Sequence, residues 1–301
     1  MGASSLDKTG GVSKMPKARR GLKEKLEAVL APSELSLVYR SYDIVGDIAV
    51  IKVPESLVEK SRLIAEAIME THKHVSTVLR QVTPIHGDLR IRGLEWVAGE
   101  RKTETVHREF GCLFKVDLKR CYFSPRLLNE RMRIARLVRE GETVVNMFSG
   151  VGCYSIIIAR HSKARKVYSI DINPDAVRYM RENVRLNRVE GVVEPIEGDA
   201  KDVILERLRR VADRVLMPLP EKAYKYVEYA LEALKERGGW IHYYDFEHAS
   251  KGEDPVRKVE WKVSERLRSL KARFTVAHGK VVRTVGPRFY QIVLDILVKQ
   301  P

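Results

Sequence analysis

The stretch TVVNMFSGVGCYSIIIARHSKARKVYSIDINPDAVRYMRENVRL, residues 143–186, decides the fold class of this chain. It contains two short apolar runs, TVVNM and KVYSIDI, and each is followed by a segment with helical periodicity, the second from Pro174 to Leu186. Glycines in FSGVG separate the first strand from the first helix. Because a strand, a helix and a second strand of these lengths make a βαβ unit, the stretch predicts parallel strands.

The same alternation continues toward the C-terminus. Further strands are predicted at GVVEPIEGDA, DRVLM and GGWIHYYDF, with helices from about Lys201, from Pro220 to Gly238–Gly239, and over about 256–271. The last two segments, FTVAHGKVVRTV and RFYQIVLDILV, alternate as strands do and are expected to form a hairpin that adds an antiparallel strand. Residues 141–301 therefore predict an α/β domain with a doubly wound, mainly parallel sheet.

Two segments precede that domain. Residues 1–21 are rich in Gly, Ser and Lys and lack periodicity, so we expect a disordered basic arm. Residues 22–140 predict a smaller α+β domain, with a short helix, a hairpin in SYDIVGDIAVIKV and a helix over 55–72. Strands and turns follow, and then an amphipathic helix over 126–140 that ends near Gly141.

Composition narrows the function classes. With 44% hydrophobic residues the 301-residue chain can build a core, and it contains neither a run of eighteen apolar residues nor an apolar leader before a cleavage site, so we expect no membrane span and no secretion. Its three cysteines lack CxxC spacing and a matching His cluster, which argues against zinc or disulfides and fits a reducing cytoplasm.

A net charge of +15 favours a polyanionic partner such as nucleic acid. A charge-rich thermophile surface is the alternative, since Asn and Gln are scarce.

Glycine and polar residues follow the first three strands of the α/β domain. The first strand ends in Asn146-Met147-Phe148-Ser149-Gly150-Val151-Gly152, where two glycines permit a sharp turn and close approach of a ligand. The second ends at Asp171-Ile172, whose carboxylate suits ribose hydroxyls, and the third at Gly198-Asp199-Ala200. Each signal alone fits an ordinary turn or helix cap. Together, without a Walker loop and with Ser155 where a nicotinamide motif needs glycine, they resemble the S-adenosylmethionine pocket of class I methyltransferases.

The fourth strand ends in DRVLMPLP, and Pro220 alone would be an ordinary first helical residue. Together, DRVLMPLP, WIHYYDF, RCYFSPRLLNER and NMFSGVG resemble the archaeal and eukaryotic tRNA (guanine-N1)-methyltransferase family over about residues 30–298. The resemblance implies a Rossmann-like class I methyltransferase fold, S-adenosylmethionine as cofactor, and methylation of guanosine 37 beside the anticodon. Met217, Pro218, Leu219 and Pro220 then join the cofactor-binding set, although the family usually has Asn in place of Pro218. The wybutosine-synthesising aminocarboxypropyl transferases, a sister family, share the fold and many of these motifs.

The resemblance also implies three catalytic residues. Guanine N1 carries a proton that a general base must remove, and Glu130 in SPRLLNER matches the family's base. Arg90 in GDLRIRG matches the arginine that stabilises negative charge on O6, and Tyr122 matches a residue placed against the cofactor or the base. From the residues alone, Glu130 fits a solvated helix face and Tyr122 a core aromatic. Arg92 shares a strand face with Arg90, so one of the two arginines is a candidate for binding phosphate.

The predicted partner is tRNA, bound through its anticodon stem-loop by a monomer that needs no metal ion. Phosphate contacts are expected from Arg126, Arg131, Arg283 and Arg288, and further from Arg133 and from Lys17, Arg19, Arg20, Lys23 and Lys25. Two alternatives stay open. One is a wybutosine-pathway enzyme, acting by aminocarboxypropyl transfer or by methylation of a modified guanosine 37. The other is a catalytically weak RNA-binding scaffold.

Overall fold

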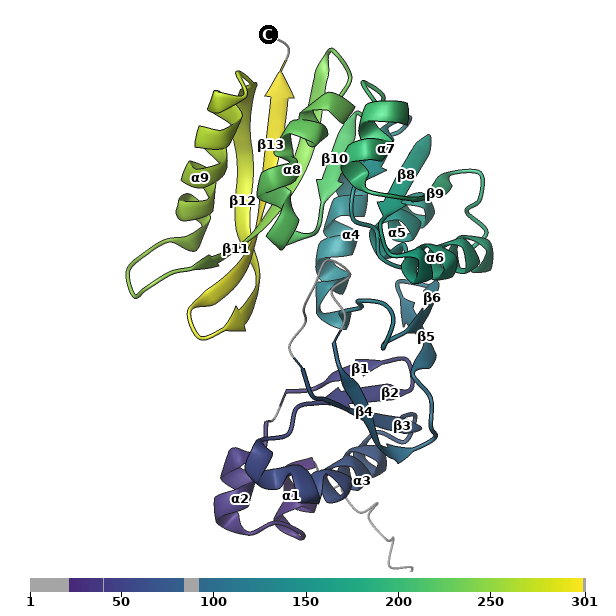
Figure 1. The fold of residues 1–301 in the computed structure, drawn as a ribbon, viewed down its shortest axis with the longest axis vertical. Coiled ribbons are helices and arrows are strands. Elements are labelled where there is room, and N and C mark those ends of the chain that lie inside the picture. The colour runs from purple at the N-terminus through teal and green to yellow at the C-terminus, as the bar shows by residue number, and fades with distance from the viewer. Residues whose placement is uncertain (1–21, 40, 84–91, 300–301) are drawn as a thin grey trace, which may run out of the picture.

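The structure is a computed structural model that describes residues 22–39, 41–83 and 92–299 (Figure 1). Its first elements are α1 (Leu22–Glu27), α2 (Pro32–Leu37), β1 (Asp43–Val45), β2 (Ile48–Ile51), the 3-10 helix η1 (Glu55–Lys60), α3 (Ser61–Thr71), β3 (Thr77–Gln81), β4 (Leu94–Gly99), β5 (Glu104–Glu109), β6 (Cys112–Asp117), the 3-10 helix η2 (Pro125–Leu127) and α4 (Leu128–Leu137). They are followed by β7 (Thr143–Asn146), α5 (Cys153–His161), β8 (Lys166–Asp171), α6 (Pro174–Leu186), β9 (Val193–Glu197), α7 (Ala200–Arg207), β10 (Arg214–Met217), α8 (Pro220–Ala233), β11 (Gly238–His248), α9 (Pro255–Ser269), β12 (Arg273–Gly286) and β13 (Phe289–Lys299). Within the described ranges, no helix combines the length and apolarity that crossing a membrane requires.

The larger part of the molecule is a seven-stranded sheet with the order β12-β13-β11-β10-β7-β8-β9. The five strands from β9 to β11 pair in parallel, while β13 pairs antiparallel with both β11 and β12. One apolar cluster lies under α4, α5 and α6, and a second lies under α7, α8 and α9, so helices cover both faces. The predicted doubly wound, mainly parallel sheet with an antiparallel addition is confirmed.

Local sequence explains where the helices begin and end. Asn173 caps α6, since its side chain accepts the backbone N–H groups of the next turn, and Pro174 occupies the first helical position, as predicted. The helix predicted over 126–140 is shorter, because Pro125 starts a 3-10 turn and Val138 is already extended. The helix predicted to end at Gly238–Gly239 ends at Ala233 instead, and β11 begins at the two glycines.

The front part of the chain carries a separate four-stranded sheet with the order β1-β2-β3-β4. Its central pair β2 and β3 is parallel, as α3 crosses over between them, and the outer pairs are antiparallel. Side chains of α1 and α3 bury one face of this sheet around Leu26, Ile64 and Ile68. In Figure 1 this sheet lies beyond the carboxyl ends of the parallel strands. The front part is therefore placed next to the edge where α/β sheets bind ligands.

The two-stranded hairpin β5–β6 joins the two sheets and packs on α6. Asn183 of α6 and Asn187, which caps the end of α6, each bond both backbone groups of one β6 residue, Lys115 and Leu113 respectively, at 2.7–3.0 Å. Their amides therefore take the place of a third strand. We predicted a domain boundary at residue 140, and the structure shows that the hairpin and α4, which precede it, pack on α6 and α5.

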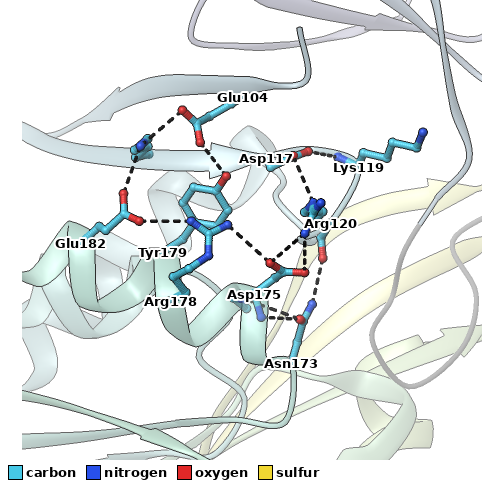
Figure 2. A network of polar contacts seen from close by, with 11 residues as sticks. Glu104, Asp117, Lys119, Arg120, Asn173, Asp175, Arg178, Tyr179 and Glu182 are labelled. Atoms are coloured by element: carbon cyan, nitrogen blue, oxygen red, sulfur yellow. Dashed lines mark hydrogen bonds and ion pairs between the residues drawn. The ribbon is translucent and has the colours of Figure 1, made fainter.

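Ion pairs and hydrogen bonds extend this contact (Figure 2). Tyr179 of α6 donates to Glu104 of β5 at 2.6 Å, and Lys115 lies between Glu104 and Glu182 at 3.3 and 3.1 Å. Asn173, which follows β8, donates its Nδ2–H to the carbonyl of Arg120 at 2.9 Å. The segment that leads into Tyr122 is thus fastened to the end of a central strand.

Candidate active site

A pocket lies at the carboxyl ends of the parallel strands, where β7 and β10 are neighbours and the strand order reverses. The predicted residues that line it are Tyr122, Arg131, Phe148, Gly150, Asp171, Ile172, Asp199, Ala200, Pro218 and Leu219. They come from four successive strand ends, from the segment after β6 and from α4. Most of the predicted cofactor set is therefore assembled around one cavity.

The glycine turn after β7 has the conformation that only glycine adopts readily. Gly150 and Gly152 have φ of +55° and +93°, and Gly152 is the N-cap of α5. The backbone N–H of Gly150 donates to Asp171 Oδ2 at 2.6 Å, so the turn is fixed against the end of β8. A Cβ on Gly152 would lie 3.0 Å from Cγ of Met180, which excludes larger residues without a shift.

Asp171 lines the pocket with a half-buried carboxylate. Its other oxygen accepts the N–H of Asn173 at 2.9 Å. Burial raises the pKa of Asp171 above its ordinary value, and the two N–H donors limit that rise. A carboxylate fixed by two backbone groups at this position is suited to accept hydrogen bonds from ligand hydroxyls.

Asp199 occupies the end of β9, and its carboxylate caps α7 by accepting the N–H of Lys201 at 2.8 Å. Tyr226 of α8 donates to both Asp199 oxygens at 3.0 and 2.8 Å, and its ring meets Phe148 edge-on at 5.3 Å between centroids. Tyr226 was not among the residues predicted from the sequence. The available signal was its helical spacing of three residues from Ala223, which is fully buried on the same face.

Four residues of the predicted cofactor set lie behind the pocket wall rather than on it. Asn146 is fully buried and donates to Ser155 at 3.1 Å, while its Oδ1 has no hydrogen-bond partner in the described part of the structure. Met217 is fully buried, Pro220 begins α8 and Gly152 begins α5. These residues shape the turns that present their neighbours.

Tyr122 stands at the mouth of the pocket and is held by the β12–β13 hairpin. Arg283 of β12 donates to the Tyr122 hydroxyl at 3.4 Å, to Ser124 Oγ at 3.2 Å and to Gln291 at 2.7 Å. The structure therefore engages Arg283, a predicted phosphate contact, inside the protein at the site itself. Its position links the last two strands of the chain to the segment that follows β6.

Arg131, also predicted to contact tRNA, is 4% exposed. Its Nη1 donates to both oxygens of Glu109 at 2.5 and 2.7 Å, and its Nη2 donates to the Ser124 carbonyl at 3.0 Å. The guanidinium also lies over the rings of Phe123 and Tyr154. These contacts are buried, and Arg131 lies in the wall of the pocket.

Glu130 is buried as well, at 3% exposure, with its carboxylate surrounded by donors. Arg133 donates to both oxygens at 2.9 and 2.7 Å, the hydroxyl of Tyr244 donates to Oε1 at 2.8 Å, and Lys280 lies 2.9 Å from Oε2. Burial acts to raise the pKa of Glu130, but Arg133, Lys280 and Tyr244 outweigh it and lower the pKa below the ordinary value. The Tyr244 hydroxyl lies 3.5 Å from that of Tyr154, which lines the pocket.

Arg133 connects Glu130 to a second buried group. It donates to both oxygens of Asp295 at 2.6 and 3.1 Å, and Asp295 also contacts Nδ1 of His242 at 2.6 Å. Since the Arg214 guanidinium can only donate, and it contacts Nε2 of His242, that nitrogen accepts and Nδ1 donates to Asp295. Burial lowers the pKa of His242, which keeps the imidazole neutral.

The remaining predicted residues lie at the surface or outside the described residues. Arg126 is exposed and pairs with Asp43 of β1 at 2.7 Å, and Arg288 is exposed in the β12–β13 turn. Arg90 and the arm residues Lys17, Arg19 and Arg20 fall outside the described ranges, as does the Lys23 side chain. Lys25 pairs with Glu70 at 2.8 Å on the front part.

Arg92 is 7% exposed, and its Nη2 has no hydrogen-bond partner in the described part of the chain. Burial lowers its pKa, while the negative charge of Asp43 acts in the opposite direction. Arg92, the described neighbour of Arg90, is therefore a buried guanidinium.

Two family models match the chain. One, described as the TRM5/TYW2 methyltransferase domain, matches residues 105–270, and the other, described as the TYW2 N-terminal domain, matches residues 22–103. Among curated proteins, tRNA (guanine(37)-N(1))-methyltransferase Trm5b of Pyrococcus abyssi is 41% identical over 292 residues, which cover 95% of this chain and 82% of that protein. The tRNA 4-demethylwyosine(37)-methyltransferase Taw21 of Saccharolobus solfataricus is 39% identical over 264 residues, which cover 86% and 94%.

Solved structures show the same likeness. A complex of aTrm5 and tRNALeu superimposes with a TM-score of 0.81 at 32% identity, covering 98% of this chain and 83% of that one. TYW2 of M. jannaschii in complex with AdoMet superimposes with a TM-score of 0.65 at 28% identity, covering 87% of this chain and 100% of that one.

Proposed function

Because the chain belongs to the TRM5/TYW2 methyltransferase family, we propose that it transfers the methyl group of S-adenosylmethionine to N1 of guanosine 37 in tRNA. The observation that carries this proposal is the buried, ionised Glu130, connected through Tyr244 to Tyr154 in the wall of the pocket. A carboxylate beside a cofactor pocket is the group that deprotonation of guanine N1 requires.

The cofactor of this enzyme is S-adenosylmethionine, and the residues of the pocket fit it. Asp171 and Asp199 offer carboxylate acceptors for hydroxyl and amine groups, and Phe148, Ile172 and Leu219 offer apolar surface for a base. Gly150 brings backbone close to the cavity without a side chain. The bound cofactor supplies an electrophilic methyl group on a sulfonium.

In this proposal Glu130 removes the N1 proton of the guanine. Its pKa is lowered, so it stays ionised at neutral pH, and the hydrogen bonds from its neighbours fix the orientation of the carboxylate. Tyr122, held by Arg283, positions the base at the pocket mouth. Arg90 is proposed to stabilise negative charge on O6, and buried Arg92 adds a second positive charge two residues further along the chain.

The proposed substrate surface extends from the pocket mouth to the front part of the chain. Arg126 and Arg288 are exposed and suited to phosphate contacts, and the net charge of +15 favours a tRNA partner. We propose a cytoplasmic monomer. Three register shifts interrupt the pairing of β12 with β13, and such irregularities in an edge strand oppose pairing with a second copy.

A second candidate is methylation of 4-demethylwyosine at position 37. The observation that favours it is coverage, since the match spans 94% of Taw21 but 82% of Trm5b. Pro218, which stands where the guanine-N1 family usually has Asn, lines the pocket and offers no side-chain hydrogen bond. Replacement of Asn by Pro would weaken the binding of a bulkier tricyclic base less than the binding of guanine. Aminocarboxypropyl transfer is the third reaction in the family.

Transfer of labelled methyl to defined tRNAs tests the proposal. The purified chain is incubated with a transcript carrying G37, with a G37→A transcript, and with tRNA carrying 4-demethylwyosine, and the nucleosides are identified by mass. Labelled 1-methylguanosine from the first transcript alone supports the proposal, and Glu130→Gln should then abolish most transfer while retaining cofactor binding. Product from the wyosine tRNA alone selects the second candidate. No product from any tRNA refutes both.

A further inference from the structure

The donors around Glu130 differ in how readily each can leave. Arg133 is 20% exposed, and its other nitrogen contacts are with Asp295, which is itself bonded to fully buried His242. Tyr244 is fully buried in the middle of the sheet. Neither side chain has room to move away from the carboxylate without disturbing the core.

Lys280 is different, because it reaches Glu130 from the edge strand β12 and its side chain is 36% exposed. Within the described ranges, it forms an ion pair with Glu130, at 2.9 Å from Oε2. The residues that follow it in β12 include Arg283, which contacts Tyr122 at the pocket mouth. Lys280 is therefore a flexible cation at the boundary between the buried carboxylate and the surface where RNA is proposed to bind.

Lys280 contributes one of the two positive charges in the cluster around the Glu130 carboxylate. Glu130 and Asp295 carry two negative charges, and Arg133 and Lys280 carry two positive charges, while His242 is neutral. The cluster is balanced as it stands, and Oε2, the oxygen Lys280 contacts, is occupied. Without Lys280 the cluster has one surplus negative charge, and Oε2 of Glu130 keeps the hydrogen bond from Arg133 but has lost its second partner. Such a cluster has a higher affinity for one proton.

We propose that Lys280 is an exchangeable counter-ion, which holds Glu130 in the free enzyme and moves to an RNA phosphate when the target nucleotide enters. The proposal rests on the proposed role of Glu130 as base. In the reaction, the N1 proton passes to Oε2, the N1 electron pair forms the bond to the methyl carbon, and the carbon–sulfur pair leaves with sulfur. The proton replaces the charge that Lys280 withdrew, so the cluster is balanced again.

The exchange explains how one carboxylate serves two states. Glu130 is faced by Arg133 from α4, Tyr154 from α5, Tyr244 from β11, Lys280 from β12 and, through Arg133, Asp295 from β13. With Lys280 in place the buried carboxylate is stable but a weak base. When Lys280 binds a phosphate of the RNA instead, the same carboxylate becomes a stronger base. This change therefore happens only when substrate is bound.

The first test measures the titration of Glu130 without turnover. The protein carries ¹³C-labelled glutamate carboxyls, the Glu130 resonance is identified by its loss in Glu130→Gln, and S-adenosylhomocysteine replaces the cofactor. Adding an anticodon stem-loop RNA with G37 should raise the pKa of Glu130 in the parent by about one unit or more. In Lys280→Met the pKa should already be raised in the free protein and change little with RNA. An unchanged pKa in the parent on RNA binding overturns the proposal.

The second test measures affinity for the same RNA against salt. Lys280→Met should make the slope of log affinity against log salt shallower by about 0.7–0.9, the contribution of one phosphate contact. Lys280→Arg should keep the parent slope. Lys163→Met is the matched control, because exposed Lys163 pairs with exposed Glu140 near the amino end of β8, and it should leave the slope unchanged. An unchanged slope in Lys280→Met overturns the exchange.

Both readouts need binding only, so they separate this proposal from the proposed function. If the parent transfers no methyl group but both readouts move as expected, the exchange stands and the assignment of the reaction fails. If the parent transfers methyl and neither readout moves, the reaction stands and Lys280 is a fixed structural partner.

Discussion

Breaking the Arg131–Glu109 pair should destabilise the fold severely, while replacing both residues should not. The two side chains are 4% and 2% exposed, and two hydrogen bonds of 2.5 and 2.7 Å join them. Removing one partner leaves an uncompensated buried charge, which costs about 3–5 kcal/mol, whereas exchange of both partners for apolar residues is often neutral or stabilising. Glu109→Leu and Arg131→Met alone should therefore each lose about 3–5 kcal/mol, and the double variant should recover most of it.

Urea unfolding followed by circular dichroism measures this cycle, with cofactor absent so that binding does not add stability. His107, 3.4 Å from Glu109, loses this contact in Glu109→Leu and in the double variant alike, so the comparison of those two variants does not include it. Affinity for tRNA is measured on the double variant in parallel. Additive losses in the double variant would refute the account of a compensated buried pair. A shallower salt dependence of tRNA binding would show that Arg131 contacts phosphate after all.

Further outcomes are expected from other parts of the molecule. Gly152→Ala, at φ +93°, should cost about 1–2 kcal/mol of stability and weaken binding of the cofactor in calorimetry, because a left-handed residue with a Cβ is strained. Tyr226→Phe removes the hydroxyl bonded to Asp199 and should weaken cofactor binding about fivefold, as one hydrogen bond is worth about 1 kcal/mol. Burial acts to raise the pKa of Asp47, but hydrogen bonds from Lys102 and two hydroxyls lower it from 3.8 to about 2. The contribution of Asp47 to stability should therefore be lost as pH falls from about 4 to 2. Asp47→Asn should make the free energy of unfolding depend less on pH in that range. Affinity for tRNA should fall at least roughly tenfold between 50 and 200 mM salt, and a nearly flat dependence would show that the charge surplus is surface composition.

The order of elements in the α/β domain was predictable because the signals were local. Strand 143–146 is fully buried with two valines at its centre, and Asn173 and Pro174 mark the start of α6 independently of anything distant. Helix ends without such signals were less predictable. The end of α8 at Ala233 depends on Ala212 pairing with Leu234 and accepting the N–H of Lys235, a contact across some twenty residues that no periodicity reveals.

The site was predictable to the extent that single strand ends form it. Asp171 and Asp199 follow strands and line the pocket, as expected from topology alone. The partners of Glu130 were not predictable, since Tyr244 and Lys280 lie 114 and 150 residues away and meet it only when β11 and β12 are placed. Sequence likewise suggested an exposed role for Arg131, because Glu109, which explains its burial, belongs to the β5–β6 hairpin.

That hairpin has a consequence for how the molecule opens and folds. Two strands alone are marginally stable in water, and in the described part of the chain the amides of Asn183 and Asn187 take the place of a third strand beside β6. If the hairpin separated from α6, both asparagines and four backbone groups would lose their hydrogen-bond partners at once. The hairpin and the sheet domain should therefore unfold as a single cooperative unit. The backbone amides of Leu113 and Lys115 are therefore expected to exchange with deuterium as slowly as those of the central strands. The segment that carries Tyr122 follows β6 directly, so its order would be lost only when the whole domain unfolds.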